Sequence, residues 1–188
     1  MQWSLVGSEM CIRDRYWIVK TNNGKIFSTP NVIIAGGVGS FEPRKFPVKE
    51  CEKFENKSVF YSVNDKKIFE GKTVAIFGGG DSALDWAVEL SKNSKVNLIH
   101  RREEFRGSQA TVNKVLALVK EGKINLFTKY QMTSIKGNGQ LESIDIKNDD
   151  DEKKNIKADY ALGFFGLIMQ LGPIANWGLN LDKKTIEV

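Results

Sequence analysis

A glycine-rich turn with the spacing of a pyrophosphate-binding loop lies near the middle of the chain. Gly78-x-Gly80-x-x-Ala83 directly follows the apolar run Thr73–Phe77 and opens an amphipathic segment. The first glycine of such a turn permits a tight bend, the second lets the backbone approach a pyrophosphate, and the alanine allows a helix to pack closely on the strand. The unpaired N–H groups and partial positive charge of the helix N-terminus suit the same anion. We expect the cofactor to contact the residues of this turn, namely Gly78, Gly79, Gly80, Asp81, Ser82 and Ala83.

A cluster of basic residues stands where the next strand of such a unit ends, about twenty residues further along. The sequence there is His100-Arg101-Arg102, with Arg106 shortly after, in place of the acidic residue that binds the ribose hydroxyls of NAD. Guanidinium groups bind a 2′-phosphate through charge-assisted hydrogen bonds, whereas a carboxylate would repel it. The sequence therefore predicts NADPH as the nucleotide, with these four residues at its 2′-phosphate end. The alternative is that the arginines lie on a solvated loop beside acidic residues.

These residues need a parallel sheet with helices between its strands. The segment after the glycine turn has apolar residues at helical spacing, and Asp81 or Ser82 is expected to cap it. A second strand is predicted over Lys95–His100, followed by a helix that Ser108 opens and Gly122 ends. Further strands are then predicted at Ile124–Tyr130, Met132–Lys136, Leu141–Lys147 and Ala158–Leu162. This order predicts an α/β fold, in which a Rossmann-like parallel sheet carries a β-meander.

The N-terminal part has a different pattern. Two short apolar runs on either side of Asn22-Asn23-Gly24 predict a β-hairpin. A buried strand is expected at Asn31–Ala35, which ends in Gly36-Gly37-Val38-Gly39. Pro43 and Pro47 then interrupt regular structure, and we expect the chain to cross between domains there.

Composition limits the class of protein. The 188 residues are 41% hydrophobic, which suffices for a core, and no apolar run approaches the roughly 20 residues of a membrane span. The formal net charge of +5 favours an anionic ligand or an acidic partner. Only Cys11 and Cys51 are present, so we expect neither a disulfide framework nor a metal site, and we expect a reducing, cytoplasmic compartment. The acidic run Asn148–Glu152 lacks the spacing of a calcium loop and is expected to be a solvated hairpin tip.

Taken together, the glycine turn and the stretch His100–Arg106 resemble the NADPH signature of the thioredoxin-reductase superfamily. The segment Ile34–Lys45 resembles the crossover of the ferredoxin-NADP reductase branch, and Phe165–Leu167 with Leu171–Leu179 resembles its return crossover. The resemblance implies FAD and NADPH as cofactors, with hydride passing between nicotinamide and flavin and no acid–base catalyst. It implies FAD contacts at Phe41, Gly36 and Gly37. It also implies ferredoxin or a similar iron–sulfur protein as partner, a homodimer at full length, and neither a nucleic acid nor a membrane as partner.

The branch is indicated by a missing motif. Thioredoxin reductases carry a redox Cys-x-x-Cys upstream of the glycine turn, where this sequence has Tyr61–Asp65. Without that dithiol, electrons cannot pass to a disulfide partner by the usual route. Two alternatives remain open: a thioredoxin-reductase-like enzyme with another acceptor, and a non-enzymatic NADP-binding module.

The resemblance also sets the expected domain limits. Residues 1–15 contain a stretch, Met10–Arg15, that resembles the translation of a transposon end, so we expect them to be non-native and leave them out of the fold. Residues 16–46 and 166–188 are expected to be parts of an FAD-binding domain, and residues 47–165 the NADPH-binding domain. A second glycine fingerprint for FAD and a Gly-Asp motif beside the flavin are both missing from the sequence. We therefore expect a fragment that is inactive alone.

Overall fold

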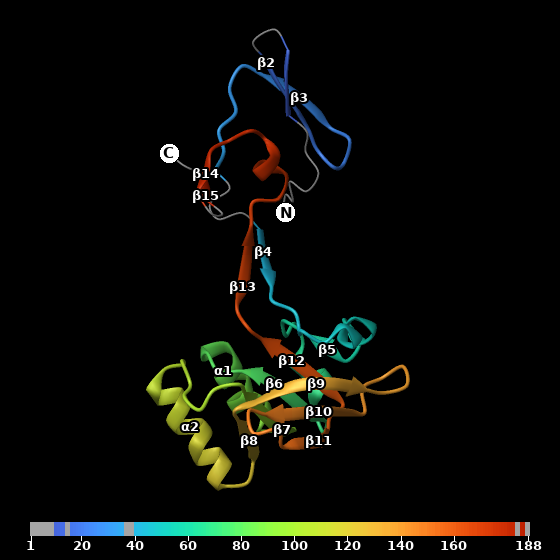
Figure 1. The fold of residues 1–188 in the computed structure, drawn as a ribbon, viewed down its shortest axis with the longest axis vertical. Helices are drawn as coiled ribbons and strands as arrows, with labels where there is room; N and C mark the ends of the chain where they lie inside the picture. Colours follow the sequence, from blue (N-terminus) through green and yellow to red (C-terminus); the bar gives the residue numbers. More distant parts are fainter. Residues whose placement is uncertain (1–9, 14–15, 36–39, 183–184, 187–188) are drawn as a thin grey trace. The chain divides into compact units, whose positions relative to one another are not determined.

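The computed structural model describes residues 10–13, 16–35, 40–182 and 185–186. These fall into two units (Figure 1). Unit 2 is Pro43–Gly166, and unit 1 consists of the described parts of Met1–Glu42 and Leu167–Val188.

The centre of unit 2 is a five-stranded sheet in the order β5-β12-β6-β7-β8, in which all pairs are parallel. Its strands are β5 (Val59–Phe60), β6 (Thr73–Gly78), β7 (Lys95–His100), β8 (Ile124–Thr128) and β12 (Tyr160–Phe164). Because parallel strands share one direction, the carboxyl ends of β6, β7 and β12 meet at the same edge. The predicted glycine turn and basic cluster follow two of these ends.

Two helices cover one face of this sheet. They are α1 (Asp81–Leu90) and α2 (Gln109–Lys120), and Figure 1 shows them side by side. The Ser108 Oγ accepts a hydrogen bond from the backbone N–H of Thr111 at 3.3 Å, and Gly122 follows α2 with a φ of +71°. Both ends of α2 are thus as predicted. No helix in the described part of the chain is both long enough and apolar enough to cross a bilayer.

A β-meander covers the opposite face. It consists of β9 (Tyr130–Lys136), β10 (Ser143–Asn148) and β11 (Lys153–Lys157), paired antiparallel. Alternate residues of β6 pack on the two sides, with Val74 and Ile76 toward the helices and Ala75 and Phe77 in the core beneath the meander. The predicted parallel sheet with a meander packed on it is therefore confirmed.

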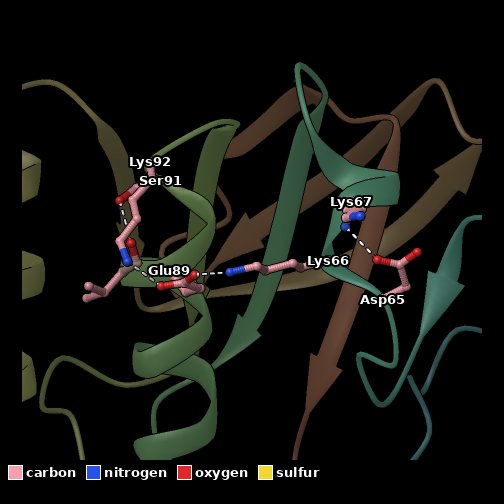
Figure 2. A network of polar contacts seen from close by, with 7 residues as sticks. Asp65, Lys66, Lys67, Glu89, Ser91 and Lys92 are labelled. Carbon is pink, nitrogen blue, oxygen red and sulfur yellow. Dashed lines mark hydrogen bonds and ion pairs between the residues drawn. The ribbon is translucent and has the colours of Figure 1, made fainter.

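Two short 3₁₀ helices, η1 (Lys49–Phe54) and η2 (Lys66–Phe69), precede β5 and β6 in the sequence. Lys66 of η2 pairs with Glu89 near the end of α1, with 2.6 Å between Nζ and Oε1, and Lys92 pairs with the same carboxylate (Figure 2). The hydrogen bond from Lys66, with that from Lys92, lowers the pKa of Glu89 to about 2. This surface network ties η2 to the end of α1 that is remote from the glycine turn.

Unit 1 contains a three-stranded antiparallel sheet of β1 (Met10–Arg13), β2 (Tyr16–Lys20) and β3 (Ile26–Thr29). The turn between β2 and β3 includes Gly24 at a φ of +80°, so the predicted hairpin is confirmed. Strand β4 (Ser40–Pro43) pairs with β13 (Leu167–Gln170), and β14 (Leu181–Asp182) pairs with β15 (Thr185–Ile186). In the sequence, η3 (Gly172–Asn176) lies between β13 and β14.

Three predictions about elements need correction. Asn31–Ala35 is not a strand, and the Ile33 side chain is 91% exposed, because no described strand lies beside this apolar run to pair with it. The strand predicted over Ile124–Tyr130 ends at Thr128, because Lys129 has a φ of +66° and turns the chain out of the parallel sheet. Part of the segment left out of the fold, Met10–Arg13, forms β1.

Candidate functional site

A cavity of about 520 Å³ opens in unit 2 where β6, β7 and β12 end. Its volume lies within the ~300–1,000 Å³ of typical small-molecule sites. The predicted site residues that line it are Gly78, Gly79, Gly80, His100, Arg101, Arg102 and Arg106. The fold thus brings the two motifs, which are some twenty residues apart in sequence, to a single hollow.

The three glycines of the turn differ in what a side chain at each position would meet. Gly78 has a φ of +153°, and a Cβ there would lie 2.7 Å from the Phe164 carbonyl oxygen and 2.8 Å from the Ala83 Cβ. A Cβ on Gly79 would lie 2.2 Å from the Cε1 of His100. A Cβ on Gly80 would meet no atom within 4 Å, so this position faces open space. Only the last glycine leaves room for a ligand to approach the backbone.

The start of α1 is free to receive an anion. Gly80 is the N-cap residue and has no side chain to cap the helix, and no side chain in the described part of the chain accepts a hydrogen bond from the first turn, so the expected cap by Asp81 or Ser82 is wrong. The Asp81 Oδ1 instead accepts from the backbone N–H of Ser108 at 2.7 Å. The first-turn N–H groups of α1 therefore lack an intrahelical partner and carry the partial positive charge of the helix. Asp81 and Ser82 are exposed at this end, whereas Ala83 is fully buried against the sheet.

The loop after β7 carries three exposed arginines, Arg101, Arg102 and Arg106. None of them forms an ion pair with a carboxylate of any residue that the structure describes. The neighbouring Glu103 pairs instead with Lys129, at 2.7 Å between Oε2 and Nζ. Arginines without a carboxylate partner at the edge of a cavity can bind an anionic ligand. A loop whose cations were already neutralised by carboxylates would bind such a ligand less well.

The same loop is bonded to the glycine turn. The Arg106 N–H donates to the Gly79 carbonyl oxygen at 2.7 Å. His100, only 7% exposed, lies beneath the loop with its Nε2 3.0 Å from the Glu104 carbonyl oxygen and its ring stacked on Phe105. Burial and, more weakly, the nearby arginine cations lower the pKa of His100, which favours the neutral form of its imidazole.

Several lining residues were not predicted as site residues. Arg44 and Phe46 enter the cavity wall from the segment after β4, and Gln131 enters from β9. The Phe46 N–H donates to the Tyr61 Oη at 3.2 Å, and that hydroxyl donates to Glu55 at the same distance. Arg44 lies within the crossover segment recognised in the sequence, but its approach to the cavity depends on a fold that no local pattern reveals.

Of the predicted FAD contacts, only the backbone of Phe41 falls within the described residues. Gly36 and Gly37 lie outside the described residues. The backbone of Phe41 belongs to β4, whereas its side chain lies outside the described part.

Cys51 is a buried structural thiol. Its Sγ lies 3.5 Å from the Met132 Sδ, and burial, with smaller contributions from Glu50 and Glu55, raises its pKa to about 12. A thiol with such a pKa is not the nucleophilic thiolate that disulfide exchange requires. Among the described residues, no group of three or more potential metal ligands gathers.

The sequence matches a known family, described as pyridine nucleotide-disulphide oxidoreductase, over residues 9–187. A protein named ferredoxin-NADP reductase from Pelagibacter ubique is 66% identical over 172 residues, which cover 92% of this chain and 51% of that protein. Another of that name from Parvibaculum lavamentivorans is 49% identical over 179 residues, which cover 94% of this chain and 52% of that protein. The chain thus spans about half the length of the curated relatives it matches.

Solved structures share the fold at low identity. Thioredoxin reductase from Lactococcus lactis superimposes with a TM-score of 0.76 at 24% identity, over 93% of this chain and 56% of that one. Bacillithiol disulfide reductase from Staphylococcus aureus gives a TM-score of 0.76 at 18% identity, over 93% and 53%. These similarities confirm the predicted fold class.

Proposed function

The chain belongs to the pyridine nucleotide-disulphide oxidoreductase family, as the resemblance of its motifs predicted, and from this premise we propose that unit 2 is the NADPH-binding part of a ferredoxin-NADP reductase. The observation that carries the proposal is the set of three arginines beside the open glycine turn, none of which pairs with a carboxylate of a described residue. NADPH has two anionic groups to place, a pyrophosphate and a 2′-phosphate. The cavity offers backbone N–H groups for the first and arginines for the second.

The nucleotide fits the residues that are present. Gly80 faces open space at the N-terminus of α1, where backbone N–H groups can bind the pyrophosphate. Arg101, Arg102 and Arg106 can bind the 2′-phosphate, which is the group that distinguishes NADPH from NADH. The Asp81 carboxylate accepts a hydrogen bond from the backbone N–H of Ser108 and does not occupy the first-turn N–H groups of α1.

We further propose FAD as the second cofactor of the full-length protein and ferredoxin as its partner. A flavin accepts hydride from NADPH and can release single electrons, which suits an iron–sulfur acceptor. The proposed flavin contacts are Gly36, Gly37 and Phe41, and they rest on the resemblance of Ile34–Lys45 to the family's crossover segment. The name of the two relatives supports the acceptor, and the absence of a Cys-x-x-Cys at Tyr61–Asp65 is consistent with it. The proposed full-length form is a homodimer of the cytoplasm.

The 188-residue chain is expected to bind NADPH but not to retain FAD and to be inactive alone. The proposed NADPH site lies wholly within unit 2, whereas the chain spans about half of its curated relatives. The flavin absorbance of the purified chain and a calorimetric titration with NADPH would be measured together. Stoichiometric bound FAD would show that the domain assignment is wrong, and a failure to bind NADPH would remove the proposed site.

The full-length protein, supplied with FAD, is expected to reduce ferredoxin with NADPH and not to reduce thioredoxin. Cys51 is buried and has a raised pKa, so it does not replace a redox dithiol. The assay compares ferredoxin-dependent cytochrome reduction with thioredoxin-coupled disulfide reduction. Activity in the second assay alone would assign the protein to the thiol-reductase branch, and inactivity in both with NADPH still bound would favour a non-enzymatic module.

A further inference from the structure

We propose that His100 is a positioning residue whose buried ring fixes the arginine-bearing loop, residues 101–107, against the glycine turn and so sets the preference for NADPH over NADH. The inference rests on the proposed NADPH site. It assigns His100 a role different from that of the arginines, because the ring acts through the backbone of the loop and does not itself bind the phosphate.

The ring occupies the space that a side chain at position 79 would need. A Cβ on Gly79 would lie 2.2 Å from the Cε1 of His100 and 2.5 Å from both ring nitrogens. Real Cβ atoms do not approach other atoms so closely, so the imidazole and any larger residue at this position exclude each other. Position 79 is variable in the G-x-G-x-x-A pattern, yet His100 makes glycine necessary here.

The ring of His100 also contacts the arginine-bearing loop directly. Its Nε2 lies 3.0 Å from the Glu104 carbonyl oxygen, and it stacks on Phe105 with 5.2 Å between ring centroids and 17° between planes. The carbonyl can only accept, so the neutral ring must carry its proton on Nε2 to make this bond. The loop returns to the turn one residue after Phe105, where the Arg106 N–H donates to Gly79. Gly79, His100 and the loop therefore form one packed assembly.

The charge of His100 has no part in this role. Burial and the cations of Arg101, Arg102 and Arg106 disfavour its protonation, and the hydrogen bond to Glu104 opposes them less strongly. A protonated imidazole would add a further cation to a group of three. The ring contributes by holding the arginines in place, and a held set of donors loses less conformational freedom when it binds a phosphate.

The experiment measures the dissociation constants of NADPH and NADH for the 188-residue chain and its variants by calorimetry, with circular dichroism to check that each variant is folded. His100→Ala is expected to weaken NADPH by about tenfold and to leave NADH within about threefold, because one supporting hydrogen bond and its packing are lost. His100→Gln is expected to retain most of the preference for NADPH, because its amide N–H can still donate to the Glu104 carbonyl.

The pair Gly79→Ala and Gly79→Ala/His100→Ala gives an independent measurement. The single change is expected to weaken both nucleotides, since the added Cβ displaces either the turn or the ring. The double variant is expected to bind each nucleotide as the His100→Ala chain does, with the same reduced preference for NADPH, so the two changes are not additive.

The outcomes separate two kinds of failure. A starting chain that shows no preference for NADPH would overturn the proposed function itself. If the unchanged chain prefers NADPH, a His100→Ala variant whose preference is undiminished, or a double variant whose losses are additive, would overturn only the role of His100.

Discussion

Replacing Gly78 with alanine is expected to lower the free energy of unfolding of the chain by about 2–6 kcal/mol, the sum of roughly 1–3 kcal/mol of backbone strain and 1–3 kcal/mol of overpacking. The positive φ of Gly78 is unfavourable for any other residue, and its Cβ would press on the Phe164 carbonyl oxygen and on Ala83. Both atoms belong to packed elements, β12 and α1, which cannot move aside cheaply. Urea unfolding followed by circular dichroism would measure the change.

Gly80→Ala is the matched control, because the same methyl group is added two residues away. A Cβ there meets no atom within 4 Å, so the stability is expected to stay within about 1 kcal/mol of that of the unchanged chain. NADPH binding is nevertheless expected to weaken, since the methyl group enters the space proposed for the pyrophosphate. Equal unfolding midpoints for Gly78→Ala and Gly80→Ala would contradict this account of the turn.

Replacing Arg101 with alanine is expected to weaken NADPH by roughly 10- to 150-fold, which corresponds to the loss of one charge-assisted contact worth about 1.5–3 kcal/mol. NADH should be affected much less, because it lacks the 2′-phosphate. The arginine is exposed and has no carboxylate partner among the described residues, so its removal leaves no buried charge unpaired. Calorimetric titration with each nucleotide would measure both constants.

Lys120→Ala is the control for charge alone. Lys120 is an exposed cation in the last turn of α2, whereas the first turn of this helix lies next to the arginine loop. Its removal lowers the net charge by the same amount and is expected to leave both nucleotides nearly unaffected at moderate ionic strength. Equal weakening of NADPH and NADH by Arg101→Ala would remove Arg101 from the 2′-phosphate site.

Features whose cause is local could be predicted from the sequence. The N-cap Ser108 and the C-terminal Gly122 define α2 because capping depends on the residues at the helix ends. The strand Lys95–His100 was predicted with its observed bounds, because the apolar residues Val96, Leu98 and Ile99 form a short run that polar residues bound and only Asn97 interrupts. The two site motifs could be recognised for a similar reason, since each is a short run of adjacent residues.

Two of the errors have a different cause, which is a partner distant in sequence. Asp81 was expected to cap α1, but its carboxylate accepts from Ser108, on the loop before α2. Asn31–Ala35 has the composition of a buried strand, but burial depends on neighbours that the local pattern does not contain. The contact between His100 and Gly79 is likewise invisible until β6 and β7 lie side by side.

The hydrogen bond from the Arg44 N–H to the Gly166 carbonyl oxygen, 3.0 Å long, joins the two ends of unit 2. Unit 2 is therefore a closed insertion: the chain enters and leaves it at almost the same point. A flexible insertion would add a loop-closure cost that grows with the logarithm of its length, whereas a folded insertion with touching ends presents the same short gap whatever its size. Turns such as that at Asn148–Glu152 can thus lengthen or shorten over evolution without changing the distance between the end of β4 and the start of β13.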